Sequence, residues 1–514
     1  MKPLIAKGAA DWPLCLNQEQ LLLSREWMRR HSNTLPPSLT PTALTLHGVL
    51  NYDALARALN EIVSRHAAFR MRIYPHPDVG ASERDASLAA FGRGIYRPGL
   101  YRQSVAEDVA LAVRKLDLGG LNQGAANEVL RTTVLEEVTQ PFDYDRPPLM
   151  RATLLKRGPE DHLLIVVVDH AVADAWSMRI LRSELALLYE HFSGGTAYPL
   201  PKPGPHYPDY AMWQNEAMAG SHFASSAAYW TQQWARFGSS RIAIRELPFA
   251  LSESQRAKVS FGVVRAALEP GTCQQIRRLA RRSRVTLNMV FLAAYAIVLH
   301  SYTRKAKLAL WGHFSNRGRP EFQNTIGYFV HSHLIGIDFS SDPSGAELLQ
   351  QVRATVLDAC DHQEMPLPYL WQKLNCWPRY ADARVLLDYH CGEKETDPSS
   401  TGLVIRRAKL PESLTGRFSS LGVYVNDDQE RISFSVQYLK ARFPQVPVEH
   451  LVEDLQVVIA RFLADPERKV AAFFDRPRYP GSSSVEPASE MGEFVVLENG
   501  AIPSLPVTGR AQAV

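Results

Sequence analysis

The chain has few cysteines and no long apolar segment. It contains five cysteines, none in a CxxC pair and one necessarily unmatched: Cys15, Cys273, Cys360, Cys376 and Cys391. Scattered thiols of this kind predict a protein without disulfides in a reducing, cytoplasmic compartment. The most apolar long stretch, Val285 to Leu299, is shorter than the about 20 residues that a bilayer requires, so we predict a buried core helix and no membrane span.

The sequence also lacks a strong charge of either sign. Lys and Arg total 57 against 53 acidic residues, a formal net charge of +4, which does not predict a nucleic-acid partner. The short apolar piece before Lys7 and Asp11 is not the pattern of a secretory signal. With 46% hydrophobic residues the composition is that of a soluble globular protein, and 514 residues exceed what one hydrophobic core supports, so we predict at least two lobes.

The most informative feature is an aspartate and a histidine, Asp169 and His170, placed directly after an apolar run. Residues Leu163 to Val168 contain no polar side chain, which predicts a strand covered on both faces. Ser177 then opens a helical pattern that ends at Gly194 and Gly195. A strand-turn-helix junction exposes the tip of a side chain while packing fixes its backbone, as a general base requires, so we predict that His170 is that base.

The segment Asp169 to Ser177 resembles the HHxxxDGxS signature of the condensation domains of nonribosomal peptide synthetases, which belong to the chloramphenicol-acetyltransferase-like acyltransferases. Asp169 stands in place of the first histidine and Ala175 in place of the glycine. Taken alone, the same residues also fit a buried histidine satisfied by hydrogen bonds and an aspartate that caps the following helix.

Other segments resemble the remaining motifs of this family in the expected order. They are Leu16 to Gln20 with Trp27, Arg65 to Arg70, Pro141 to Arg151, Tyr207 to Trp213, Asn316 to Glu321, Ile326 to Val330, His362 to Pro366, and Tyr438 with Phe443. The resemblance covers about residues 14 to 475. The chain is therefore identified as a member of the condensation-domain family.

The resemblance implies a mixed α/β fold, with two chloramphenicol-acetyltransferase-like lobes in a V-shaped pseudo-dimer and the active site in a tunnel between them. We place the N-terminal lobe at residues 1–197 and the C-terminal lobe at residues 198–475, and we predict a strand in the second lobe from Ile326 to Ile337. The proline-rich piece 199–208 cannot form a helix or a central strand and predicts an extended linker between them.

Two further segments lack clear periodicity. Residues 79–103 contain glycines and prolines beside charged residues, which predicts a surface loop. Residues 476–514 predict a flexible tail, in which Glu493 to Glu498 is a candidate docking element that would add a strand to a partner. A plain disordered terminus is the alternative for this tail.

The resemblance also implies the reaction. In this family an acyl or peptidyl carrier protein presents a thioester on a phosphopantetheine arm, and an amine or hydroxyl attacks it. The acceptor is a small molecule or a second carrier-bound group. No metal, no cofactor of its own, no nucleic acid and no membrane are implied, and we expect a monomer. His170 would accept or orient the proton of the nucleophile.

Supporting roles follow residue by residue. The resemblance implies that Asp174 pairs with Arg317 and holds the lobes in register, and that the backbone amide of Ala175 stabilises the oxyanion. Trp176 is predicted to lie in the core or the tunnel wall. Ser177 would cap the helix or bond a phosphopantetheine amide, and capping is the favoured role.

The departures from the family pattern carry expectations of their own. A carboxylate at Asp169 would raise the basicity of His170 if the two lie close together. His331 stands where the family has asparagine, and we predict that it lines the acceptor side of the tunnel. His331, His333 and His313 would suggest zinc, but no third ligand is fixed by spacing, so we predict no metal site.

The sequence therefore predicts a free-standing condensation enzyme of natural-product biosynthesis that forms an amide or ester. An epimerisation domain shares the histidine motif but normally lies inside a larger synthetase. The alternative from another class is a catalytically degenerate module that recruits partners to an assembly line. The arginines between Arg277 and Arg284 fit a carrier-docking surface, although a solvated helix face is the favoured interpretation.

Overall fold

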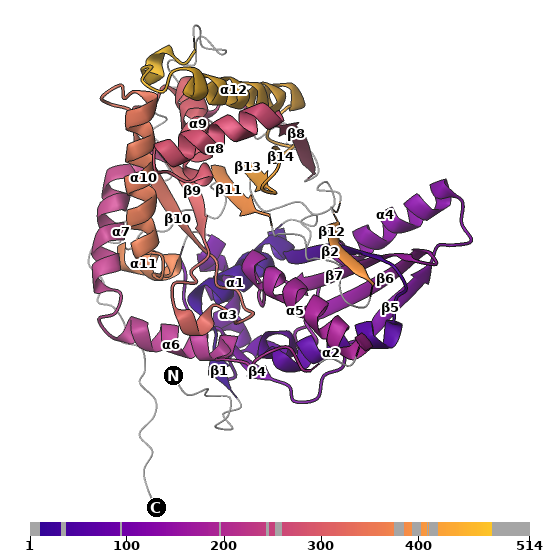
Figure 1. The fold of residues 1–514 in the computed structure, drawn as a ribbon. Coiled ribbons are helices and arrows are strands. Elements are labelled where there is room, and N and C mark those ends of the chain that lie inside the picture. The colour runs from indigo at the N-terminus through magenta and orange to yellow at the C-terminus, as the bar shows by residue number, and fades with distance from the viewer. Residues whose placement is uncertain are drawn as a thin grey trace, which may run out of the picture.

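The computed structural model describes residues 11–31, 38–92, 95–194, 197–242, 246–251, 260–374, 385–392, 402–408, 410 and 420–474. They form a mixed α/β protein with a five-stranded sheet in an N-terminal lobe and a six-stranded sheet in a C-terminal lobe. The two lobes diverge toward the ends that carry α4 and α12 (Figure 1). The predicted α/β class with two lobes is confirmed. The tail and its candidate docking element lie outside the described residues.

The N-terminal sheet has the strand order β12-β2-β7-β6-β5. Its strands are β2 (Leu39–His47), β5 (Val113–Asp117), β6 (Met150–Gly158), β7 (Asp161–Asp169) and β12 (Val404–Ala408). The helices packed with it are α2 (Tyr52–Arg65), α4 (Gln123–Thr139) and α5 (Ala175–Gly194). α2 and α5 share one core cluster with the sheet, and α4 lies with the cluster on the other face.

Strand β7 lies between β2 and β6 and is covered on both faces. Leu164, Val166 and Val168 belong to the cluster that includes α2 and α5. Leu163, Ile165 and Val167 belong to the cluster that includes α4. The unbroken apolar run therefore alternates between two cores, as predicted, and the end of β7 is held rigidly because the strand is buried from His162 to Asp169.

The C-terminal part of the chain contributes to both lobes. β12 pairs antiparallel with β2, with Val404 opposite His47, and Figure 1 shows this orange strand beside the N-terminal strands. Tyr207, Phe322 and Phe329 also lie in the N-terminal core. The sequence division at residue 197 is therefore crossed by segments that tie the two lobes together.

The C-terminal sheet has the order β10-β9-β11-β13-β14-β8. Its strands are β8 (Phe261–Ala267), β9 (Lys307–Phe314), β10 (His331–Asp338), β11 (Val385–Cys391), β13 (Leu421–Asp427) and β14 (Ile432–Leu439). The helices of this lobe are α7 (Ala224–Phe237), α8 (Pro270–Arg282), α9 (Leu287–Thr303), α10 (Gly345–Asp361), α11 (Leu367–Leu374) and α12 (Gln445–Ala464). β9 and β13 flank β11 in parallel, and the other pairings of this sheet are antiparallel.

Helix α9 is the buried core helix predicted from its composition. Thr286 caps it, and every residue from Met289 to Leu299 is buried. Within the described residues no single helix is long and apolar enough to cross a membrane, and only α8 and α9 taken as a pair bent by 101° pass such a test.

Three local expectations are corrected. Residues 79–103 were expected as a loop, but they include α3 (Ala81–Gly92) and the start of β4 (Tyr101–Val105). Leu88 and Phe91 of α3 pack with Leu16 and Leu23 of α1 (Leu16–His31), so packing orders a helix whose own amphipathic pattern is weak. β4 lies between β1 (Trp12–Pro13) and β3 (Met71–Pro75) in a separate small sheet.

The linker and the expected strand at 326–337 also differ in part. Pro208 lies in the first turn of α6 (Tyr207–Ala219), a position where proline is tolerated because the helix needs no amide hydrogen there. The linker before it is extended and fixed to α2, since Arg65 donates to the carbonyl of Pro201 at 3.0 Å. The strand predicted from Ile326 begins only at His331.

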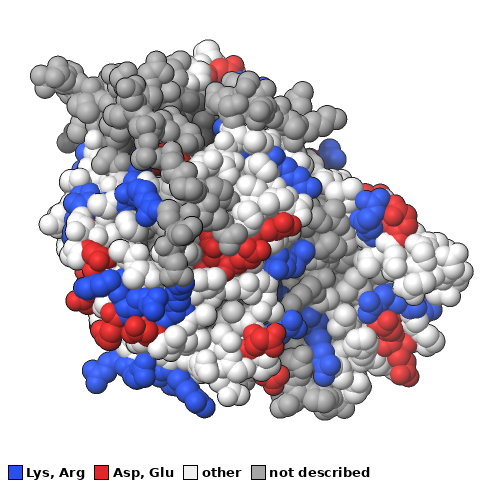
Figure 2. All heavy atoms as spheres, turned by 90° about the horizontal axis from the view of Figure 1, so that it is seen from above, with Lys and Arg blue, Asp and Glu red and all other residues white. Residues whose placement is uncertain are grey.

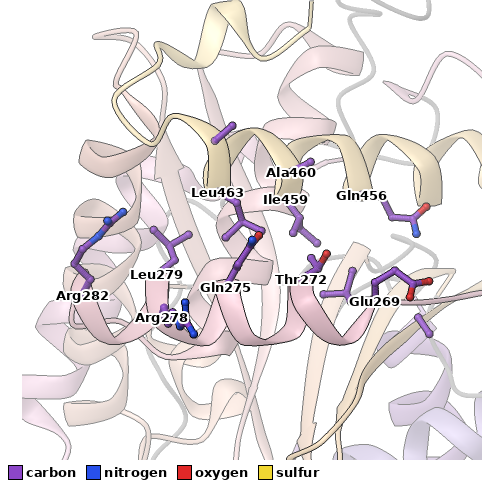
Figure 3. A pocket seen from close by; sticks show the side chains of 13 residues that line it. Glu269, Thr272, Gln275, Arg278, Leu279, Arg282, Gln456, Ile459, Ala460 and Leu463 are labelled. Atoms are coloured by element: carbon purple, nitrogen blue, oxygen red, sulfur yellow. The ribbon is translucent and has the colours of Figure 1, made fainter.

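The surface seen from above the C-terminal lobe has basic and acidic side chains interspersed (Figure 2). A groove lies between α8 and α12 and contains none of the predicted site residues (Figure 3). Arg278 and Arg282 line this groove, whereas Arg277 forms an ion pair with Asp427. The arginines of α8 are thus not one uniform solvated face.

Candidate functional site

His170 follows the last residue of β7 and is fixed by its backbone and its ring. Its amide donates to the carbonyl of Ser38 at 3.1 Å, just before β2. Nδ1 lies 2.7 Å from the carbonyl oxygen of Ala173. The ring packs edge-on against Tyr328, with centroids 5.1 Å apart. The side chain is partly exposed although its neighbours Asp169 and Ala171 are buried.

The contact with Ala173 determines which nitrogen of His170 carries the proton. A carbonyl oxygen only accepts, so Nδ1 must donate. In the neutral ring the lone pair then lies on Nε2, and no described residue donates a hydrogen bond to it. This is the tautomer that a proton acceptor needs.

Burial lowers the pKa of His170 below its usual range. The hydrogen bond to Ala173 opposes this shift, and the positive charge of Arg25 adds to it. Asp174 and Asp169 contribute smaller opposing effects. Asp169 therefore does make His170 more basic, as predicted, but burial outweighs this contribution and the net shift of the pKa of His170 is downward.

Asp174 connects the loop of His170 to the C-terminal part of the chain. Its Oδ1 lies 3.2 Å from Nη2 of Arg317, and both side chains are buried. The same oxygen accepts from the amide of Ser177 at 2.7 Å, and Oδ2 accepts from the amide of Phe329 at 3.0 Å. Asp174 is thus both the cap of α5 and the partner of Arg317.

Arg317 satisfies the rest of its guanidinium with backbone oxygens. It donates to the carbonyls of Phe322 and Thr325, and the guanidinium carbon Cζ lies 3.9 Å from the centroid of the Phe329 ring. A buried charge paired and hydrogen-bonded in this way is a strong geometric constraint. The predicted pair between Asp174 and Arg317 is present, with both partners in position to hold the loop.

Ser177 does not have the capping role that was favoured for it. It lies inside α5, is fully buried, and its amide is the one that Asp174 caps. Its hydroxyl donates to the carbonyl of Gly327 at 2.8 Å and accepts from the amide of the same residue at 3.0 Å. Arg317 also donates to it at 2.9 Å. The favoured capping role is therefore wrong, and the hydroxyl instead braces the loop at Gly327.

Ala175 and Trp176 form the exposed start of α5. Ala175 is the first residue of the helix, where the amide has no acceptor within the helix and lies at the positive end of the helix dipole. Trp176 is partly exposed, so a core position is excluded. Its indole donates to the carbonyl of Gln323 at 3.0 Å, and the guanidinium of Arg179 lies 3.8 Å from its ring centroid.

Asp169 is held by Arg25 and Tyr144, which were not among the site residues predicted from the sequence. Nη1 of Arg25 lies 2.8 Å from Oδ1 and 3.1 Å from Oδ2 of Asp169. The hydroxyl of Tyr144 donates to Oδ1 at 3.2 Å, and the amide of Ala171 does so at 2.8 Å. The departure from the histidine motif is therefore accompanied by a buried ion pair.

Helix α1 holds the loop of His170 at a second point. The side-chain Nε2 of Gln18 donates to the carbonyl of Ala171 at 2.9 Å. Gln18 and Arg25 are seven residues apart, about two helical turns, so both lie on the face that meets the loop. Helical spacing from Gln18, which belongs to the opening motif, was the signal that could have identified Arg25.

His331 does not line an accessible acceptor site. It is 1% exposed, its Nδ1 lies 2.9 Å from the carbonyl of Gln363, and its Nε2 lies 3.3 Å from the side-chain Nδ2 of Asn316. Burial lowers its pKa to about 4. The acceptor-side expectation is not supported by this geometry, because both ring nitrogens are already engaged inside the lobe.

The three histidines considered for zinc have separate surroundings. His333 is stacked on Trp230 with centroids 4.2 Å apart, and His313 lies 3.5 Å from Asp388. Among the described residues no group of three or more histidine, cysteine, aspartate or glutamate side chains is arranged to hold a metal ion.

Comparison with known proteins identifies the class. A family model described as Condensation domain matches residues 96–474, more than half of the chain. The chain therefore belongs to the condensation-domain family, which the strand-loop-helix around His170 and the pair of Asp174 with Arg317 already indicated.

Individual relatives are more distant. Malpinin synthetase of Mortierella alpina is 28% identical over 436 residues, which make up 84% of this chain and 5% of that protein. The chain thus spans a small part of the curated relative. The condensation domain of the monacolin K polyketide synthase MokA superimposes with a TM-score of 0.72 at 18% identity, covering 90% of this chain and 99% of the other.

A further structural neighbour belongs to a complex. The X-domain of teicoplanin biosynthesis, solved with OxyB, has a TM-score of 0.69 at 21% identity and covers 90% of this chain and 96% of the other. At these identities the solved structures show a shared fold. The chloramphenicol-acetyltransferase-like arrangement expected from the sequence is confirmed.

Proposed function

We propose that the protein transfers an acyl or peptidyl group from a carrier-bound thioester to an amine or alcohol, forming an amide or ester in natural-product biosynthesis. The observation that carries this proposal is the state of His170. Its Nδ1 is committed to Ala173, its pKa is lowered by burial, and Nε2 is the acceptor on a partly exposed ring. The substrate arm would be phosphopantetheine, and the protein itself needs only its own residues for this step.

The step balances without another reagent. The lone pair of the acceptor nitrogen or oxygen forms a bond to the thioester carbonyl carbon while Nε2 of His170 takes the proton. The tetrahedral intermediate then collapses, the carbon–sulfur bond breaks, and the imidazolium returns the proton to the leaving thiolate. Proton transfer of this kind contributes about 10²- to 10⁴-fold to the rate.

The first turn of α5 supplies the second requirement. Negative charge develops on the carbonyl oxygen of the intermediate, and the amide of Ala175 lies at a helix N-terminus that favours an anion. Asp174 and Arg317 would take no part in the chemical step and would instead hold the catalytic loop in place. They fix the loop from both lobes, so His170 and this helix terminus keep one relative geometry.

The decisive experiment compares His170→Ala with wild type and with His222→Ala. His222 is exposed, and its ring contacts Glu364 away from the loop, so this control removes an imidazole without touching the site. Mass spectrometry of an acyl-loaded carrier with candidate acceptors would follow product. We expect His170→Ala to lose about 10²- to 10⁴-fold in rate with unchanged circular dichroism, and His222→Ala to retain turnover. Wild-type turnover in His170→Ala would refute the proposal.

A second candidate is a non-catalytic module that recruits partners. Asp169 and Ala175 in place of the family residues favour it, and one structural neighbour is an X-domain solved in complex with OxyB. Under this hypothesis the wild type yields no product with any carrier-bound donor but binds a tailoring or synthetase protein. The orientation of His170 and the intact pair of Asp174 with Arg317 support catalysis instead.

A further inference from the structure

Asp169 and Arg25 form a unit that lies beside His170 but takes no part in the step described above. Arg25 comes from α1 and Asp169 from the end of β7, and their contact is 2.8 Å. The side chains are 3% and 16% exposed for Asp169 and Arg25. A buried carboxylate next to the base would be costly without this partner.

The same arginine is also tied to the backbone of the loop. One nitrogen of Arg25 donates to the carbonyl of Ser38, which is the carbonyl that accepts the amide of His170. Tyr144 contributes its hydroxyl to both Arg25 and Asp169. Arg25 therefore contacts both the residue before His170 and the backbone acceptor of His170 itself.

We propose that Arg25 is a positioning residue that neutralises Asp169 and so keeps His170 in its proton-accepting form. Asp169 stands where the family motif has histidine, and Arg25 supplies the opposite charge, so the pair carries no net charge. The catalytic part of this inference rests on the proposed function. The electrostatic part, the effect of Arg25 and Asp169 on the pKa of His170, does not depend on the reaction.

The charged and titratable groups around His170 determine in which direction each substitution should shift its pKa. From α1 comes Arg25, from β7 Asp169, from the cap of α5 Asp174 with its partner Arg317, and the ring of Tyr328 packs on the imidazole. Only Arg25 and Asp169 can be removed without touching the interlobe pair. Removing the cation leaves an anion that favours imidazolium, and removing the anion leaves a cation that opposes it.

The test is a double-mutant cycle of Arg25→Met, Asp169→Asn and both together in the full chain. Arg29→Met is the matched control, because Arg29 lies on the same helix, is exposed, and contacts only Glu26 among the described residues. The pKa of His170 would be followed by NMR with labelled histidine, assigned with a His170→Gln variant, beside turnover from pH 5 to pH 9.

We expect Arg25→Met to raise the pKa of His170, so turnover at pH 6 relative to pH 8 falls by about threefold or more. Asp169→Asn should lower that pKa, the double variant should return it toward the wild-type value, and Arg29→Met should leave it unchanged. Each single variant should melt at a lower temperature than the double variant, because each leaves one buried charge without its partner.

An unchanged pKa of His170 across the cycle, or a shift of the same sign in both single variants, would overturn the inference. This readout needs no substrate. Failure of the wild type to condense any substrate would refute the proposed function and leave the NMR result to decide the role of Arg25.

Discussion

Nη2 of Arg317 lies 3.2 Å from Oδ1 of Asp174, although the two residues are 143 positions apart in the chain. The exposed fractions of the two side chains are 2% and 3%. Because Asp174 also caps α5 and accepts from Phe329, this one carboxylate joins the loop of His170 to the segment after β9. Loss of activity on changing Asp174 would therefore report position as well as chemistry.

Asp174→Ala should lower stability and activity together. It leaves the buried guanidinium of Arg317 without its counter-charge, which costs on the order of 3 to 5 kcal/mol. Thermal melting and chemical denaturation would measure the loss. The matched control is Asp161→Ala, which breaks an exposed pair with Arg157 and should cost at most about 1 kcal/mol. Equal melting of Asp174→Ala and wild type would show that the pair adds nothing to stability.

Ala175→Pro tests the role of the Ala175 amide independently of its side chain. Proline is tolerated at the first position of a helix and lacks only the N–H, and Ala175 is exposed, so the fold should persist. If this amide stabilises the oxyanion, turnover falls by about 10²- to 10³-fold. Ala175→Gly keeps the amide and restores the family residue, and it should retain turnover. A proline variant as active as the glycine variant would assign the oxyanion to another donor.

His331→Asn should reduce the loss of stability in acid. Burial lowers the pKa of His331 to about 4, while the unfolded chain binds this proton near the ordinary value of about 6.5. The folded state therefore has its full stability above pH about 6.5 and loses it as pH falls toward about 4.

Urea unfolding at pH 7.5 and pH 5 would measure this difference. Between these values the wild type should lose about 2 kcal/mol more than His331→Asn, since other buried histidines such as His333 are common to both proteins. A loss of the same size in both would mean that His331 is not titrated by unfolding.

Removal of residues 475–514 tests the docking element predicted from sequence. A strand added to a partner would raise the effective concentration of the carrier. Truncation after Phe474 should then leave turnover of a small soluble thioester unchanged and weaken turnover of the native carrier-bound substrate. A full-length variant with Phe494 and Val496 changed to Ser should behave like the truncation. Equal use of the native carrier by all three proteins would contradict the docking element.

The sequence alone determined the elements whose signals are local. The apolar run of β7, the turn with His170 and the helix α5 were predictable, because burial on both faces and helical periodicity are written in neighbouring residues. The same holds for α9, whose apolar composition and Thr286 cap specify a buried helix. Motifs in the expected order also gave the family, and with it the pairing of Asp174 with Arg317.

Tertiary structure alone decided the features that depend on distant partners. Periodicity cannot show that β12 crosses to β2, that His331 is enclosed by Asn316 and Gln363, or that Arg25 reaches Asp169. α3 was missed for the same reason, since its order comes from packing on α1. The pKa of His170 likewise depends on burial and on a charge from another helix, and both exist only when the chain has folded.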